Sequence, residues 1–81
     1  MMNDEQLFLM LKEILVETFE LDESEISLES NLYEDLDLDS IDAVDLVVKL
    51  REQTGKKIEP ADFKQVRTVS DVLAAIKKLL D

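Results

Sequence analysis

A helix is predicted by the stretch DSIDAVDLVVKLREQTG, residues 39–55. Asp39 can cap a helix that begins there or one residue later, and Asp42 would lie in the first turn, where a carboxylate interacts favourably with the helix dipole. Gly55 is a typical helix stop. We therefore expect this helix to end at about Thr54.

The predicted helix has two apolar faces. The face that we assign to the core holds Ala43, Leu46, Val47 and Leu50. The second face holds Ile41, Val44 and Val48. A helix that is apolar over so much of its circumference is either deeply buried or carries a binding face. Because a chain of 81 residues has little room for a fully buried helix, we favour a binding face.

A preceding helix is expected over residues 4–19, with Asn3 or Asp4 as its cap. Its core positions, spaced for one helical face, are Leu7, Leu11, Ile14, Leu15 and Phe19. Leu9 and Val16 fall on the opposite face. They are either scattered exposed residues or a second surface for a partner.

A last helix is expected from Ser70, as its cap, to Leu80, with Val72, Leu73, Ile76 and Leu80 facing inward. Before it, Pro60 suits the first position of a short helix that ends at Phe63 or Lys64. The core positions of this region are Ile58, Phe63 and Val66.

Residues 20–38 show no sustained helical period and are expected to form a long structured loop. The expected apolar anchors of this loop are Leu21, Ile26, Leu28, Leu32 and Leu36. The fold class is therefore all-α: a small bundle of three to four helices, in a single domain over residues 1–81, with a long structured loop between the first two main helices.

Charge is distributed unevenly along the chain, whose net charge is −11. Residues 1–45 hold fifteen acidic residues and one basic residue, Lys12, whereas residues 46–81 hold five acidic and eight basic residues. A basic partner would be steered to the acidic half. Nucleic acid is not an expected partner, because phosphate binding needs clustered Lys and Arg.

Two residue types are missing from the sequence, which contains no cysteine and no histidine. There is thus no thiol nucleophile, no disulfide, no thiolate metal site and no imidazole base, and we assign no catalytic and no metal-binding residue. The N-terminal residues are acidic where a secretory signal is basic, and the apolar run Leu7–Leu11 is too short to span a bilayer. A cytoplasmic location without an integral membrane segment is expected, an organelle matrix being the other possibility.

Six acidic residues surround one serine, Ser40: Glu34, Asp35, Asp37, Asp39, Asp42 and Asp45. A calcium loop that starts at Asp35 would place Ser40 where glycine is needed and Leu46 where glutamate is needed, so this hypothesis fails. A hydrolase would need a base and a strained glycine turn beside the serine, but only carboxylates are near it and the glycine turn is absent. The structural alternative is that Ser40 is an ordinary helix cap.

The segment DLDLDSIDAVDLV, residues 35–47, nevertheless resembles the phosphopantetheine attachment motif of acyl carrier proteins. The likeness covers nearly the whole chain. It extends to LKEILVETF at residues 11–19, LYEDL at 32–36, IEP at 58–60 and VRTVSDV at 66–72.

The resemblance implies that the chain is a carrier and not an enzyme. A separate Mg²⁺-dependent phosphopantetheinyl transferase, such as holo-acyl-carrier-protein synthase, would attach 4′-phosphopantetheine from coenzyme A to Ser40, between Asp39 and Ile41. The thiol of that arm would carry an acyl chain as a thioester. Partner enzymes would be acyl-transferring and chain-elongating enzymes of fatty-acid, polyketide or related lipid synthesis, with basic patches beside their active sites. The chain is expected to be a monomer.

The resemblance also assigns a partner surface, formed by Asp37, Asp39, Ile41, Asp42, Val44, Asp45 and Val48. A core that could open around an acyl chain would be bounded by Leu46, Val47, Leu50, Phe63 and Val66.

The chain departs from the family pattern at Asp37, where the family usually has glycine, and at Lys49 and Arg51, where the second helix is usually acidic. These differences suggest a specialised carrier rather than a housekeeping one. An aminoacyl or peptidyl carrier is a further possibility within this class, although the paired glycines common in those domains are missing. From a different class, the alternative is an unmodified acidic adaptor that binds a basic partner through Ile41, Val44 and Val48.

Overall fold

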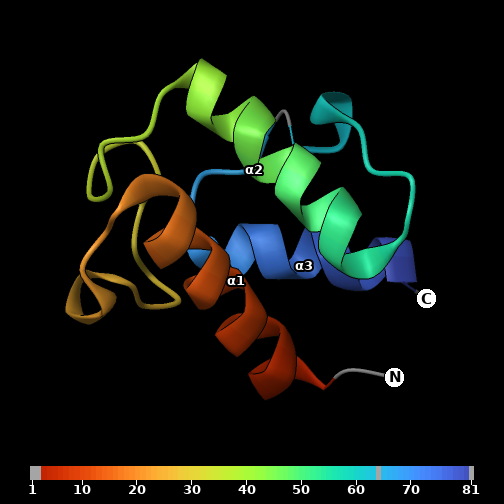
Figure 1. Cartoon of the computed structure of the whole chain (residues 1–81), viewed down its shortest axis with the longest axis horizontal. Helices are drawn as coiled ribbons and strands as arrows, with labels where there is room; N and C mark the ends of the chain where they lie inside the picture. The colour runs from red at the N-terminus through yellow and green to blue at the C-terminus, as the bar shows by residue number, and fades with distance from the viewer. Residues whose placement is uncertain (1–2, 64, 81) are drawn as a thin grey trace.

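Three α-helices form the fold of this computed structural model, which describes residues 3–63 and 65–80. Helix α1 spans Asp4–Phe19, α2 spans Ser40–Thr54 and α3 spans Val69–Leu80. Two single turns of 3₁₀ helix lie between them, η1 at Glu23–Glu25 and η2 at Pro60–Phe63. Helix α1 packs against α2 and α3, and η2 packs against the same two helices (Figure 1). The all-α prediction, with a long loop between the first two main helices, is confirmed.

Helix α1 begins with a reciprocal pair of hydrogen bonds. The Asn3 side chain accepts from the Gln6 N–H at 2.8 Å, and the Gln6 side chain accepts from the Asn3 N–H at 3.0 Å. This capping box makes Asn3 the cap, the first of the two predicted candidates. Of the predicted core positions, Phe19 is half-buried, while Leu7, Leu11, Ile14 and Leu15 are buried.

Helix α3 begins earlier than predicted, at Val69 rather than after Ser70. The cap is the side chain of Thr68, whose Oγ1 accepts from the Asp71 N–H at 3.1 Å. Ser70 is an exposed residue of the first turn, so its assignment as the cap was wrong. The shift buries Val69 completely, beside Val72 and Ile76. Leu73 and Leu80, the other predicted inward residues, are only partly buried.

The long connection between α1 and α2 is tied to the residues around the start of α3. The Leu32 N–H donates to the Arg67 carbonyl at 2.8 Å, and the Ser70 N–H donates to the Leu28 carbonyl at 2.9 Å. Because these bonds pair backbone groups of both segments, the loop is ordered although η1 is its only helix among the described residues. An antiparallel bridge between Asn31 and Thr68 also joins the loop to the later segment.

The predicted anchors of this loop are mostly correct. Ile26, Leu32 and Leu36 are buried and Leu21 is half-buried, but Leu28 is wrong, because 48% of it is exposed. Sequence reasoning also missed Leu38, which is buried.

The loop also contains a buried polar residue, Ser30, that no sequence pattern revealed. Its Oγ accepts from the Ser27 N–H at 3.0 Å and donates to the Glu25 carbonyl at 2.9 Å. Ser30 therefore links η1 to the following turn.

Between α2 and α3, Ile58, Phe63 and Val66 are buried as predicted. The short helix begins at Pro60 and ends at Phe63, while Lys64, the alternative end, lies outside the described residues. Buried side chains from all three helices, the loop and η2 belong to one hydrophobic cluster. In the described part of the chain, no helix is both long and apolar enough to cross a membrane.

Candidate functional site

Ser40 is the first residue of α2 and is exposed to solvent. No hydrogen bond to its hydroxyl is found among the residues that the structure describes. The prediction that a helix begins at Asp39 or Ser40 is confirmed, and its cap is Asp39 rather than Ser40, so the interpretation of Ser40 as an ordinary helix cap was wrong. Ser40 is therefore held in place by the backbone, while its hydroxyl remains accessible.

A capping box fixes the backbone around Ser40. The Asp39 Oδ1 accepts from the N–H groups of Ile41 and Asp42, each at 2.9 Å, and the Asp42 Oδ2 accepts from the Asp39 N–H at 3.1 Å. Both carboxylates thus bind backbone donors at the positive end of the helix dipole. These two residues, which sequence reasoning assigned to the partner surface, also determine where α2 begins.

Asp37 adopts an uncommon backbone conformation. Its φ is 58°, in the left-handed region that glycine enters freely and that aspartate tolerates better than most residues. The side chain is exposed, while its neighbours Leu36 and Leu38 are both buried. The backbone thus turns sharply at Asp37 so that both leucines reach the core just before α2.

The second apolar face of α2 is exposed, as predicted. Ile41 is 71% exposed, and Val44 and Val48 are exposed by nearly half. On the opposite side, Leu46, Val47 and Leu50 are buried. Ala43, assigned to the core, is half-buried.

The predicted site residues gather along one edge of the molecule. Ile41, Val44 and Val48 continue along α2 from Ser40, and Asp45 is exposed on the same helix. Asp37 approaches from the preceding loop, where a hollow of about 470 Å³ lies between the end of α1 and the start of α2. This hollow is lined by residues of both segments, among them Phe19, Leu21, Leu36, Asp37 and Asp42.

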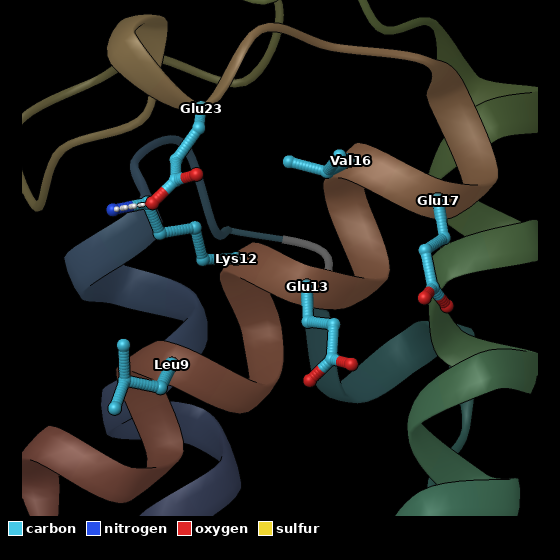
Figure 2. Close-up of a pocket in the computed structure, with 6 residues that line it drawn as sticks. All are labelled: Leu9, Lys12, Glu13, Val16, Glu17 and Glu23. Atoms are coloured by element: carbon cyan, nitrogen blue, oxygen red, sulfur yellow. Dashed lines mark ion pairs between the residues drawn. The ribbon is translucent and has the colours of Figure 1, made fainter.

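A separate hollow of about 430 Å³ lies on α1 and does not include Ser40 (Figure 2). It is lined by Leu9, Lys12, Glu13, Val16, Glu17 and Glu23. Leu9 is 55% exposed and Val16 is half-buried, so the two residues line one hollow rather than being scattered. That this hollow receives a partner remains a hypothesis.

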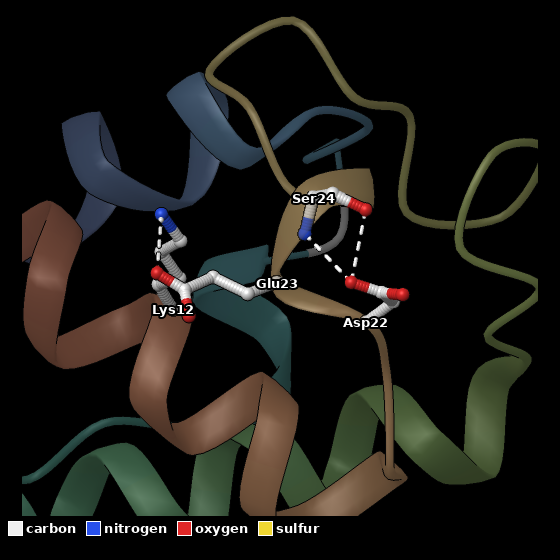
Figure 3. A network of polar contacts seen from close by, with 4 residues as sticks. All are labelled: Lys12, Asp22, Glu23 and Ser24. Carbon is white, nitrogen blue, oxygen red and sulfur yellow. Dashed lines mark hydrogen bonds and ion pairs between the residues drawn. The ribbon is translucent and has the colours of Figure 1, made fainter.

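Lys12 closes one side of that hollow. Its Nζ lies 3.3 Å from the Glu23 Oε1 and 5.6 Å from the centre of the Phe8 ring. Next to Glu23, the Asp22 Oδ1 accepts from the N–H and the hydroxyl of Ser24, which lowers the pKa of Asp22 (Figure 3). The Lys12–Glu23 pair connects α1 to η1, which gives Lys12 a structural role.

No group of three or more acidic residues in residues 3–63 and 65–80 is arranged to hold a metal ion.

Comparison with known protein families gives one match that covers most of the chain. Residues 11–76 match the sequence model of the family described as "Phosphopantetheine attachment site". The matched region includes Ser40, its capping box and the exposed face of α2.

Comparison with individual proteins gives matches over nearly the full length. The chain is 47% identical over 79 residues to Acyl carrier protein 2 of Ralstonia nicotianae, covering 98% of each sequence. It is 38% identical over 80 residues to the acyl carrier protein of Thermotoga maritima, covering 99% of each. It is 40% identical over 67 residues to the acyl carrier protein of Chlamydia caviae, covering 83% of this chain and 87% of that one. The chain therefore belongs to the acyl carrier protein family, whose members are phosphopantetheine-bearing carriers and not enzymes.

Proposed function

We propose that Ser40 is the residue to which 4′-phosphopantetheine is attached and that the arm carries acyl groups as thioesters. The observation that supports this most directly is the exposed hydroxyl at the first residue of α2, which has no hydrogen-bond partner among the described residues. The Ser40 oxygen would form a phosphodiester with the pantetheine phosphate of coenzyme A, and the nucleotide part would leave.

The surroundings of Ser40 fit this group. The start of a helix favours a negatively charged phosphodiester, because the positive end of the helix dipole lies there. The nearest carboxylates, of Asp39 and Asp42, are already bonded to backbone N–H groups and do not bond to the serine hydroxyl. An extended arm can therefore leave the surface at Ser40 without displacing a structural contact.

The chain itself provides no means of activating Ser40. The sequence contains no histidine, and the neighbouring carboxylates serve as helix caps. We infer that a phosphopantetheinyl transferase, such as holo-acyl-carrier-protein synthase, supplies the base and the Mg²⁺. The protein's own contribution is to present the serine on a rigid helix start.

The partner surface is proposed to comprise Asp37, Asp39, Ile41, Asp42, Val44, Asp45 and Val48. Its exposed apolar side chains would contact acyl-transferring and chain-elongating enzymes of fatty-acid, polyketide or related lipid synthesis. Its carboxylates would steer basic patches on those enzymes toward Ser40. Because a carrier has to leave each enzyme after delivery, we expect modest affinity and rapid dissociation.

We further propose that the chain acts as a single domain and a monomer in the cytoplasm, in a specialised rather than a housekeeping pathway. One hydrophobic cluster shared by all three helices supports the single domain. The acyl chain would enter between α2 and η2, where Leu46, Val47, Leu50, Phe63 and Val66 are buried and would have to separate.

Intact mass spectrometry tests the attachment site. The parent, Ser40→Ala and Ser70→Ala are incubated with coenzyme A, Mg²⁺ and a broad-specificity phosphopantetheinyl transferase. Ser70 is a matched control, because it is also an exposed serine in the first turn of a helix. We expect one pantetheine-sized mass gain on the parent and on Ser70→Ala, and none on Ser40→Ala. A gain on folded Ser40→Ala would disprove the assignment.

A further inference from the structure

The exposed apolar face of α2 continues beyond Val48 into a groove of about 580 Å³. The groove is lined by Val48, Arg51, Glu52, Gly55, Lys56 and Lys57. Arg51 follows Val44 by seven residues and Gly55 follows Val48 by seven, so both lie on the face that carries the apolar side chains. The surface that starts at Ser40 therefore extends along the whole of α2 and onto the turn that follows it.

The sign of the charge changes along this surface. Residues 34–45 contain six acidic residues and no basic one, whereas residues 49–57 contain four basic residues and one acidic residue. The 15 residues of α2 span about 22 Å, which is about two Debye lengths at 0.1 M salt. The two ends thus present separate charges of opposite sign to a partner.

The basic groups at the second end are available for contact. Arg51 and Lys56 are exposed and have no ion-pair partner among the residues described. Lys57 lies 3.9 Å from the Glu59 carboxylate and Lys49 lies 4.0 Å from the Glu52 carboxylate, which are long, exposed pairs of little strength.

The backbone between these cations is open as well. Gly55 is exposed, and a Cβ placed on it would meet nothing within 4 Å, so a partner can approach closely. A favourable interaction with the helix dipole explains the presence of one basic residue, Arg51, in the last turn of α2. It does not account for Lys56 and Lys57, which follow the helix end and line the same groove.

We propose that this surface, defined as Asp39–Lys57 with its exposed apolar face, docks a partner enzyme whose own surface carries both signs of charge. The partner would be basic opposite Asp39, Asp42 and Asp45, and acidic opposite Arg51, Lys56 and Lys57. This inference rests on the proposed carrier function and adds to it the charge pattern of the cognate enzymes.

A surface with an acidic end and a basic end determines both the orientation in which a partner docks and which partners bind. An enzyme with a uniformly basic patch would be attracted at the Ser40 end and repelled at the Lys56 end. An enzyme with the matching pattern would be attracted at both ends, in one orientation only. Ser40 would then be held at the basic end of the partner, and carriers that are acidic along the whole helix would bind it less well.

Two synthetic peptides test this pattern on the unmodified protein. Each is an amphipathic helix of about 20 residues with zero net charge and the same composition. In the segregated peptide all lysines lie in one half and all glutamates in the other, and in the mixed peptide they alternate. Fluorescence anisotropy in about 20 mM salt should show that the parent binds the segregated peptide about fivefold more tightly, a preference that disappears at about 0.5 M salt.

Charge-reversed variants show which residues cause the preference for the segregated peptide. Lys56→Glu/Lys57→Glu should reduce the preference to below about twofold. Lys77→Glu/Lys78→Glu changes the net charge equally on the last turn of α3 and should leave the preference intact. Equal affinity of the parent for both peptides, or a preference that Lys56→Glu/Lys57→Glu retains, would overturn the proposal.

Sedimentation velocity at the same concentrations tests whether a second copy of the chain, rather than an enzyme, occupies this surface. An antiparallel pair of α2 helices would also match opposite charges, so self-association that Lys56→Glu/Lys57→Glu abolishes would overturn the proposal. Mass gain on Ser40 is measured on the same samples. If the protein gains the pantetheine mass but binds both peptides equally, only this inference is contradicted. If it prefers the segregated peptide but gains no mass, only the proposed attachment site is contradicted.

Discussion

Asp39 and Asp42 cap each other at the start of α2. The Asp39 Oδ1 accepts from the Asp42 N–H at 2.9 Å, and the Asp42 Oδ2 accepts from the Asp39 N–H at 3.1 Å. Ser40 lies between them, so the geometry of its backbone depends on this pair. The same carboxylates belong to the proposed partner surface, and their structural and binding roles can be separated by substitution.

Asp39→Ala should destabilise the protein by about 1 kcal/mol, because two N–H groups of α2 lose their acceptor. Asp39→Asn keeps an acceptor oxygen, so its free energy of unfolding should be within a few tenths of a kcal/mol of the parent's. Urea denaturation followed by circular dichroism measures both. If Asp39 also attracts the transferase, Asp39→Asn should raise the KM for loading while leaving stability unchanged. If Asp39→Asn is loaded with phosphopantetheine at the same KM as the parent, Asp39 acts only as a helix cap.

Asp37→Gly should change the free energy of unfolding by no more than about 0.5 kcal/mol, because relief at a positive φ is offset by the greater freedom of glycine in the unfolded chain. Asp37→Val should destabilise by about 1–2 kcal/mol, since a β-branched residue fits poorly at a φ of 58°. Glu34→Val is the control, an exposed acidic residue of the same loop without a positive φ. Equal destabilisation by the two valine variants would contradict the backbone argument.

The limits of α1 and α2 could be predicted because their signals are local. A capping residue and a helical apolar period lie within one stretch in each case, and Gly55, which ends α2, adopts the left-handed conformation, φ 69°, that a helix stop requires. The exposed face of α2 could be predicted because the helix has more apolar positions than the core of so small a chain can bury. The start of α3 was missed because Thr68 and Ser70 are both good caps, and burial of Val69 decides between them.

The loop before α2 was less predictable, since its conformation depends on distant partners. Leu28 and Leu38 are equally apolar, yet the first is exposed and the second buried, because the loop pairs with the segment that leads into α3. Nothing in the sequence marks Ser30 as buried. The left-handed backbone at Asp37 was indicated only by its position in a motif where the family usually has glycine.

Ser30→Ala should destabilise the protein by about 1–3 kcal/mol, because the Ser27 N–H and the Glu25 carbonyl both lose their partner at a buried site. Ser27→Ala removes a nearby exposed hydroxyl, which lies 3.1 Å from the Ser30 Oγ, and should cost less than about 0.5 kcal/mol. Thermal and urea unfolding of both variants provide the measurement. Similar losses for the two variants would show that the loop does not depend on the buried hydroxyl.

Asp71 should contribute to stability in a pH-dependent manner. Its Oδ2 accepts from the N–H groups of Arg67 and Thr68, each at 3.1 Å, and these bonds hold the pKa of the carboxyl below its ordinary value of 3.8. Since the pKa is lower in the folded state, the contribution is present above the unfolded-state value and is lost as the pH falls through the folded-state value. The carboxylate is exposed, so the effect should be small.

The comparison that isolates this contribution is the difference in the free energy of unfolding between the parent and Asp71→Asn. The Asn side chain can still accept a hydrogen bond but does not titrate. Relief of charge repulsion in acid affects both proteins alike, because both keep the other nineteen of the twenty acidic side chains. The advantage of the parent should therefore be greatest near pH 7 and shrink between about pH 5 and pH 2. A difference that stays constant over this range would show that the carboxylate charge is not what stabilises the start of α3.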